Sequence, residues 1–180
     1  IFKAYDVRGT YPDQVNEEAA RAIGAAFVIY LKAKRIAVGR DMRLSSPSAA
    51  AAFIDGATSQ GCDVVDYGMI ATAMLHFAVA ADGHAGGAMV PASHSRRQYR
   101  GMKMVRREAF PLSGEEGISD IREMVTKGAV PAPAATRGTV SQANTLDAYV
   151  DHVMSFIDPS IVKPFNLVLD AGSGMGGLVA

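Results

Sequence analysis

Apolar and polar positions along this chain fall into blocks that predict helices and strands in turn. Residues 17–33 repeat their apolar side chains every three or four positions, which is the period of an amphipathic helix with one buried face. The apolar run Arg35–Val38 then predicts a strand that ends at Gly39. Ser46 and Pro47 predict the start of a second helix that runs to about Gln60, with Ser46 as its N-cap and Pro47 at its first position.

The same alternation continues through the middle of the chain. One predicted helix there is apolar nearly all round, so we expect it to be buried. Another is introduced by Ser113, with Glu116 three residues later as the partner of a capping box. The predicted elements of this part are strands at 63–66, 87–90 and 102–106, and helices at 72–81 and 114–126.

Strands that alternate with helices predict a three-layer α/β/α domain with a mixed, mostly parallel sheet. Right-handed crossovers bring the loops that follow parallel strands to one edge of the sheet, where ligands of open α/β sheets bind. We therefore expect the loops after Val38 and Val90 to lie together at that edge. The polar side chains on these two loops are Arg40, Asp41 and Arg43, and Ser93 and His94.

A stretch rich in alanine and proline, residues 128–138, predicts the end of the first domain. We assign residues 1–138 to that domain and 139–180 to a linker helix and the incomplete start of a second domain. In the second part we expect a helix over 145–157, a strand over 166–170 and a glycine-rich loop. One helix, one strand and a loop do not close a core. We therefore expect an N-terminal fragment whose remaining domains are missing.

Composition narrows the possible partners and setting. The 180 residues are 49% hydrophobic and 20% charged, which is typical of a globular domain. The 18 basic residues balance the 18 acidic ones, so we expect no bulk attraction to nucleic acid or to an anionic membrane. Cys62 is the single cysteine, which rules out an intrachain disulfide and favours a cytoplasmic location. No apolar run reaches the roughly 18 residues of a membrane span.

The candidate chemistry gathers around Ser93. This serine and His94 follow the apolar run 85–90, and Arg96, Arg97 and Arg100 come within the next seven positions. A serine at the end of a buried strand and surrounded by cations is suited to holding phosphate. The alternative is a basic surface loop that happens to contain an ordinary serine.

Three segments together carry a resemblance to a known family. Residues 1–10 (Ile-Phe-Lys-Ala-Tyr-Asp-Val-Arg-Gly-Thr), 39–47 (Gly-Arg-Asp-Met-Arg-Leu-Ser-Ser-Pro) and 91–104 around Ser93 resemble, in order and spacing, the first domain of the α-D-phosphohexomutases. Phosphomannomutases and phosphoglucomutases belong to that family. The stretches 64–79 and 167–175 are similar to it as well, so the resemblance covers nearly the whole chain.

The resemblance implies an intramolecular phosphotransferase that interconverts hexose 1-phosphates and hexose 6-phosphates. Ser93 would be a phosphoserine, with a bisphosphorylated sugar as intermediate and glucose 1,6-bisphosphate as the type of activator. An oxygen of the Ser93 phosphate would also bind Mg²⁺, which prefers hard oxygen ligands. The family's Asp-Gly-Asp-x-Asp-Arg metal loop is absent from this sequence, so we expect the fragment to be inactive alone.

The resemblance also implies roles for four further residues. His94 would donate a hydrogen bond to phosphate, Arg8 would contact phosphate, Lys103 would assist proton transfer, and Tyr5 would contact the sugar. The alternatives from the residues alone are an exposed loop histidine for His94 and a solvated strand lysine for Lys103. For Arg8, which the sequence predicts in a tight turn, the alternative is a structural ion pair with Asp6 or Asp41. For Arg40, Asp41 and Arg43 we favour a structural network that supports the Ser93 loop.

Departures from the family pattern keep other functions open. Pro91 and the pair Ser95-Arg96 replace residues of the family's Thr-Ala-Ser-His-Asn-Pro run, and Ala71-Thr72-Ala73 replaces Pro-Thr-Pro. A non-catalytic relative that binds phosphosugars is therefore an alternative. Residues 167–176 also resemble the nucleotide-binding turn of S-adenosylmethionine-dependent methyltransferases, in which glycines let the backbone approach a ligand.

Overall fold

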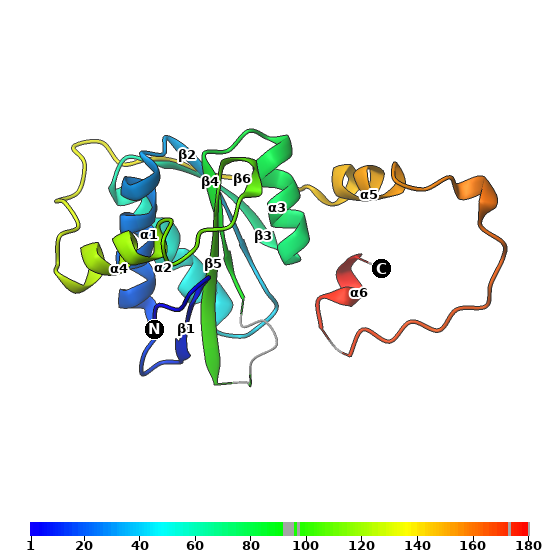
Figure 1. The fold of residues 1–180 in the computed structure, drawn as a ribbon, viewed down its shortest axis with the longest axis horizontal. Helices are drawn as coiled ribbons and strands as arrows, with labels where there is room; N and C mark the ends of the chain where they lie inside the picture. The colour runs from blue at the N-terminus through cyan, green and yellow to red at the C-terminus, as the bar shows by residue number, and fades with distance from the viewer. Residues whose placement is uncertain (92–95, 97, 173, 180) are drawn as a thin grey trace.

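The computed structural model describes residues 1–91, 96, 98–172 and 174–179, and one six-stranded sheet organises most of them (Figure 1). The strand order is β1-β5-β4-β2-β3-β6. β4, β2, β3 and β6 run parallel, whereas β5 is antiparallel to both β4 and β1. This confirms the predicted mixed, mostly parallel sheet. The strands are β1 (Val7–Thr10), β2 (Arg35–Arg40), β3 (Asp63–Met69), β4 (Gly86–Val90), β5 (Tyr99–Arg106) and β6 (Val140–Gln142).

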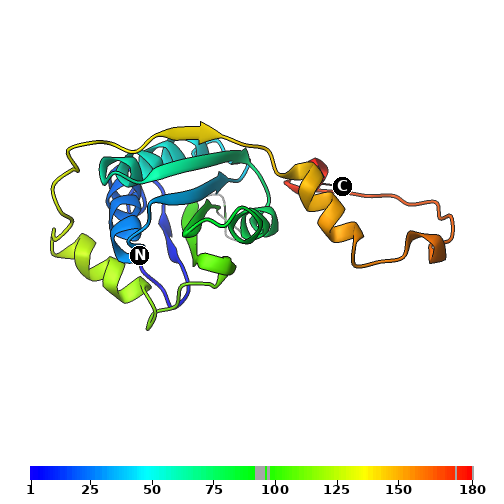
Figure 2. The same cartoon turned by 90° about the horizontal axis from the view of Figure 1, so that it is seen from above.

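Helices cover both faces of the sheet, which gives the predicted three layers (Figures 1 and 2). α1 (Glu17–Leu31), α2 (Ser46–Ser59) and α4 (Ile118–Thr126) lie on one face, and α3 (Thr72–Ala81) with the 3₁₀ turn η1 (Arg107–Ala109) covers the other. Phe27, Phe53 and Met102 belong to the core of the first face, and Leu75 and Met89 to that of the second. Among the described helices, none combines the length and apolarity that crossing a membrane requires.

The packing of α1 against α2 depends on two glycines. α1 begins after Asn16, whose side chain accepts a hydrogen bond from the amide of Ala19 at 2.9 Å. A Cβ on Gly24 of α1 would lie 2.2 Å from the carbonyl oxygen of Phe53 in α2. A Cβ on Gly56 of α2 would lie 2.0 Å from a backbone oxygen of α1. The two helix backbones are therefore in contact, which places α2 and its first turn firmly on the sheet.

Two predicted helix starts are wrong. α2 has Ser45 at its N-cap, without a side-chain hydrogen bond, and Ser46 is its first helical residue, whose hydroxyl bonds to Asp41 and does not cap the helix. The helix predicted from Gly114 begins only at Ile118 as α4, since Gly117 has a φ of +110°, outside the helical region. The Ser113 hydroxyl accepts a hydrogen bond from the Glu116 amide at 3.1 Å, so it closes a turn before the helix.

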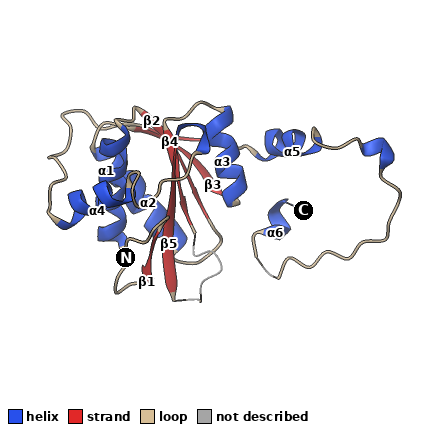
Figure 3. Cartoon of the chain, in the orientation of Figure 1, coloured by secondary structure: helices blue, strands red, loops and turns tan. Residues whose placement is uncertain are grey.

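The chain after α4 contains one element more and one fewer than predicted. β6 adds to the sheet beside β3, although its three residues carry little sequence signal. α5 (Leu146–Met154) contacts α3, with the rings of Phe77 and Tyr149 5.8 Å apart. The strand predicted over 166–170 does not form in the described chain, where these residues follow the turn η2 (Pro159–Ile161) as an irregular segment (Figure 3). They precede α6 (Gly176–Val179), and none of the described strands lies beside them to supply hydrogen bonds.

We predict that Gly24→Ala destabilises the protein although alanine is the better helix former. The new methyl group would meet the Phe53 carbonyl, and overpacking of this kind costs about 1–3 kcal/mol. Urea unfolding should show a lower midpoint. Ala51→Ser, on the exposed face of α2, is the control and should leave the midpoint nearly unchanged. An unchanged midpoint for Gly24→Ala would contradict the close approach of the two helices.

Candidate functional site

The two loops that the sequence places together do meet at one edge of the sheet. Arg40, the last residue of β2, is in register with Val90, the last residue of β4. The amide of Asp41 donates a hydrogen bond to the carbonyl of Val90 at 3.3 Å. Ser93 and His94, the predicted phosphoryl carrier and its neighbour, lie outside the described residues. The site is therefore built from the residues that hold both ends of their segment.

Backbone hydrogen bonds hold the chain on either side of residues 92–95. The amide of Gly101 donates to the carbonyl of Pro91 at 2.9 Å, which extends the β4–β5 pairing to the edge of the sheet. The amide of Tyr99 donates to the carbonyl of Arg96 at 2.9 Å. Both ends of the segment are thus anchored to β5. The departure at Pro91 leaves this anchor intact, because the bond uses the proline carbonyl rather than an amide.

Side-chain hydrogen bonds of Asp41 and Arg43 also hold the residues that flank the 92–95 segment, as the predicted supporting network requires. Nη1 of Arg43 donates to the carbonyl of Arg96 at 3.0 Å and to that of Tyr99 at 3.4 Å. Oδ1 of Asp41 accepts from the amide of Arg43 at 3.1 Å. The prediction is confirmed for these two residues. Arg40 instead lines a cavity between α2 and the β3–β6 edge of the sheet.

Arg100 is the most buried charged side chain at this edge, and sequence reasoning counted it only as one of three arginines near Ser93. Its side chain is 1% exposed, and its Nη1 donates to the Ser46 hydroxyl at 2.7 Å. That hydroxyl donates in turn to Oδ1 of Asp41. The guanidinium also lies 5.1 Å from the centre of the Tyr11 ring. Burial lowers the pKa of Arg100 from its ordinary value, and the charge of Asp41 opposes that shift.

A sequence signal for this burial existed. Side chains along a strand alternate between the two faces of a sheet, so Arg100, Met102 and Met104 share one face. Both methionines are apolar and belong to the core beneath α1 and α2. The alternation therefore places the arginine on the buried face as well.

Arg8 and Lys103 come together on the opposite face, which α3 covers. Arg8 is in register with Gly101, and Lys103 follows two positions later along β5, so both project from the same side of the sheet. Arg8 lies in β1 rather than in the predicted tight turn, because its backbone pairs with β5. Its Nη2 lies 2.6 Å from Oδ2 of Asp6, which is one of the structural ion pairs that the sequence left open.

The surroundings of Lys103 and Tyr5 differ. Lys103 is half-buried. Burial of the His76 imidazole on α3 lowers the pKa of that histidine, and the positive charge of Lys103 lowers it further. Tyr5 is 73% exposed and points away from the core. The structure therefore brings Arg8 and Lys103 to one face near the anchored segment and leaves Tyr5 in solvent.

A cavity of about 550 Å³ opens at this edge, between the described base of the segment and the C-terminal part of the chain. Asp41, Arg43, Thr72 and Pro91 line one side of it. Residues of the glycine-rich loop, including Gly174, line the other. The lining combines the polar side chains of Asp41, Arg43 and Thr72 with apolar ones such as Ile70 and Met89, a mixture and a volume that suit a ligand of sugar size.

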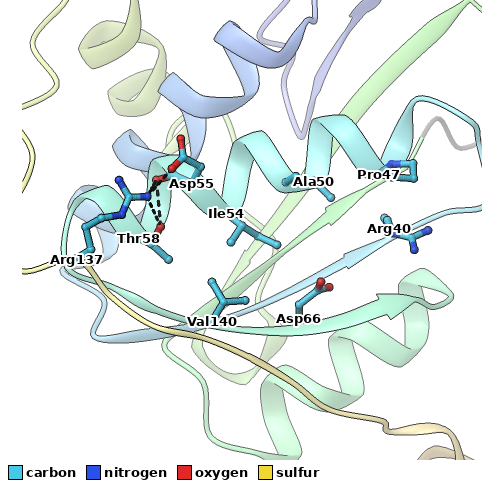
Figure 4. A pocket seen from close by; sticks show the side chains of 10 residues that line it. Arg40, Pro47, Ala50, Ile54, Asp55, Thr58, Asp66, Arg137 and Val140 are labelled. Atoms are coloured by element: carbon cyan, nitrogen blue, oxygen red, sulfur yellow. Dashed lines mark hydrogen bonds and ion pairs between the residues drawn. The ribbon is translucent and has the colours of Figure 1, made fainter.

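A second cavity, of about 480 Å³, lies between α2 and the β3–β6 edge (Figure 4). At one end Nη2 of Arg137 bonds to Asp55 and, at 3.0 Å, to the Thr58 hydroxyl. Arg40 and Asp66 stand at the other end. It shares no lining residue with the first cavity, so the two are separate.

The predicted Mg²⁺ is expected to bind through the phosphate of Ser93, which lies outside the described residues. Among the described residues, no group of three or more His, Cys, Asp or Glu side chains is placed to hold a metal ion. The Mg²⁺ site therefore stays a prediction.

Comparisons with known proteins agree with this geometry. The family model described as phosphoglucomutase/phosphomannomutase, alpha/beta/alpha domain I, matches residues 1–131. A phosphomannomutase of Salmonella typhimurium is 40% identical over 99% of this chain and 39% of its own length, and one of Escherichia coli is 41% identical over 99% and 40%. A solved phosphoglucomutase/phosphomannomutase family protein from Burkholderia thailandensis superimposes with a TM-score of 0.87 at 32% identity, covering 99% of this chain and 40% of its own.

A mixed sheet between two layers of helices, with cations near the carboxyl ends of its parallel strands, defines the class of domain. The sequence matches identify its relatives. The chain belongs to the phosphoglucomutase/phosphomannomutase family. It spans about 40% of the length of the relatives it matches. The resemblance drawn from the sequence motifs is therefore confirmed. The strand that the methyltransferase alternative needs at 166–170 is absent from the described structure.

We predict that Arg43→Ala loosens the chain around residues 92–95. It removes the side-chain hydrogen bonds to the carbonyls of Arg96 and Tyr99, each of which contributes on the order of 1 kcal/mol. Amide exchange at Tyr99 and Gly101 should rise by about ten-fold. Arg122→Ala on the exposed face of α4 is the control and should leave exchange at both amides unchanged. Equal exchange in the two variants would show that Arg43 does not support this segment.

Proposed function

We propose that this domain is the phosphoryl-carrying part of a phosphohexomutase of the phosphomannomutase/phosphoglucomutase type. One observation carries the proposal: the sheet edge anchors both ends of the Ser93 segment beside a face that presents Arg8 and Lys103. Relatives named phosphomannomutase match 99% of the chain, which supports the same reaction class. The remaining domains of those relatives would supply the rest of the active site.

The proposed reaction moves a phosphoryl group in two steps. In the first, the bond from phosphorus to Oγ of phosphorylated Ser93 breaks as a bond to a sugar hydroxyl forms, which yields a hexose 1,6-bisphosphate and a free serine. In the second, the bisphosphate turns around and returns its other phosphoryl group to the serine. The product is the isomeric hexose monophosphate, so phosphate is conserved over the cycle.

The side chains of this domain would neutralise charge and move the proton. Arg8 is suited to bidentate contact with phosphate oxygens and lies at the exposed end of its face. Lys103 would assist transfer of the proton from the attacking sugar hydroxyl to the serine oxygen as it leaves. His94 would donate to the phosphate, and Tyr5 would contact the sugar. Mg²⁺ bound through the Ser93 phosphate would add charge neutralisation, with its other ligands from outside the described residues.

The second candidate function is a relative that binds phosphosugars without turnover. Residues 95 and 96 differ from the family run in which the serine lies, and this departure favours it. The two functions differ in one readout. Incubation of the complete protein with glucose 1,6-bisphosphate should phosphorylate Ser93 in the enzyme and should leave it unmodified in the non-catalytic relative.

We predict that Ser93→Ala in the complete protein lowers the rate of mannose 1-phosphate and glucose 1-phosphate isomerisation by at least about 1000-fold, because the phosphoryl carrier is lost. Peptide mapping should show that phosphate incorporation disappears with it. Ser119→Ala, an exposed serine at the start of α4, is the matched control. Near-normal turnover of Ser93→Ala would contradict the mechanism.

Arg8→Ala should separate the phosphate role from the ion-pair role. The Arg8–Asp6 pair is partly exposed, and such pairs contribute only about 0–1 kcal/mol to stability. We therefore expect a thermal midpoint within a few degrees of wild type and a rate of phosphoryl transfer about 10- to 100-fold lower. Lys3→Ala removes an exposed cation from the same segment and should change neither quantity. A loss of stability with unchanged transfer would assign Arg8 to folding alone.

A further inference from the structure

Arg100 is an unusual residue for the interior of this domain. Burying a cation is costly unless a direct carboxylate partner and a full set of hydrogen bonds accompany it. None of the described carboxylates forms an ion pair with Arg100. Its Nε, also buried, has no hydrogen-bond partner among the described residues. An apolar side chain of similar length would be cheaper to bury here, so stability alone does not account for this arginine.

The contacts of Arg100 join three separate parts of the chain. Through Nη1 it reaches Ser46 in the first turn of α2, and through its flat face it packs on Tyr11 between β1 and α1. The amide of Tyr11 donates to the carbonyl of Gln98 at 2.8 Å, two positions before Arg100 itself. The Tyr11 hydroxyl donates to Glu17 at the start of α1 at 2.8 Å.

The polar chain continues from Ser46 to the other loop at this edge. The Ser46 hydroxyl is fully buried and donates to Asp41, which accepts the Arg43 amide. Arg43 then donates to the carbonyl of Arg96. A continuous series of contacts therefore links Arg100 to the carbonyl of Arg96, which follows residues 92–95 in the sequence.

We propose that Arg100 is a positioning residue for phosphoryl transfer: its contacts fix the backbone at Arg96 and Gln98, from which the segment that carries Ser93 is held. This inference rests on the proposed function. Its planar guanidinium can hydrogen-bond to Ser46 and stack on Tyr11 at once, which the single ammonium of a lysine cannot do. Because the cation lies on the face opposite Arg8 and Lys103, it acts through the segment rather than by contact with the sugar.

The test uses Arg100→Met and Arg100→Lys in the complete protein, with Arg35→Met as matched control. Arg35 lies at the opposite edge of the same sheet and donates to the carbonyl of Asp82. Each protein is incubated with glucose 1,6-bisphosphate, and phosphate on Ser93 is followed with time by peptide mass spectrometry. Steady-state kcat and KM for glucose 1-phosphate and the thermal midpoint are measured on the same samples.

We expect Arg100→Met to fold, because methionine is apolar and of similar length, and to phosphorylate Ser93 about 10- to 100-fold more slowly. The loss should fall on kcat, with KM within about three-fold, because the substrate is not contacted. Arg100→Lys keeps the positive charge but loses the planar guanidinium, so its rate of Ser93 phosphorylation should lie between those of Arg100→Met and wild type. Arg35→Met should behave as wild type.

The outcomes separate this inference from the function on which it rests. If the wild-type protein takes up no phosphate on Ser93, both the proposed function and the positioning role of Arg100 are overturned. Wild-type phosphorylation with an equal rate in Arg100→Met would overturn the positioning role alone. If Arg100→Met does not fold, the Arg100→Lys variant provides the test. A wild-type phosphorylation rate and kcat in that variant would likewise overturn the positioning role.

Discussion

The buried hydrogen-bond path from Asp41 through Ser46 to Arg100 is the interaction on which the geometry of this sheet edge depends. It connects the loop after β2, the first turn of α2 and the first residues of β5, which are far apart in sequence. A buried polar path of this kind favours one arrangement, because breaking the bond from Ser46 to Asp41 or from Arg100 to Ser46 leaves further buried polar groups without a partner. The close packing of α1 on α2 through Gly24 and Gly56 supports it by fixing where the first turn of α2 lies.

Positive charge reaches the edge from both faces of the sheet. Arg8 and Lys103 project on the side of α3, and Arg100 projects on the side of α1 and α2. The alternation of side chains along β5 is the physical cause, since odd and even positions point in opposite directions. A chain with zero net charge can in this way concentrate cations locally, as an anion site requires.

The cations on the two faces of the sheet differ in their exposure to solvent. On the α3 face, Arg8 is partly exposed and Lys103 half-buried, so both are accessible enough to meet a phosphate. On the other face, Arg100 is 1% exposed, and its described contacts are with Ser46 and Tyr11. Accessible cations suit direct phosphate contact, whereas a sealed cation suits the placement of backbone. The division follows from which helices cover each face, rather than from the residue types, which are similar.

The fold class and the family were predictable from the sequence, because hydrophobic periodicity and ordered motifs are local properties of the chain. The same is true of α3, whose predicted range, 72–81, agrees with the structure. The strand predicted at 166–170 failed for the opposite reason: an apolar run becomes a strand only when a neighbour pairs with it. β6 formed without a strong signal because β3 offered it an open edge.

For the site, the sequence by itself determined which residue types are available and that two loops share one edge of the sheet. The pairing of Asp41 and Arg43 with the base of the 92–95 segment was also within its reach. Only the tertiary structure decided that Ser46 bonds to Arg100 instead of capping its own helix, and that Arg8 pairs with Asp6. A hydroxyl or a guanidinium has several possible partners of similar strength. Which one it meets depends on how distant segments pack, and that information is not local to any motif.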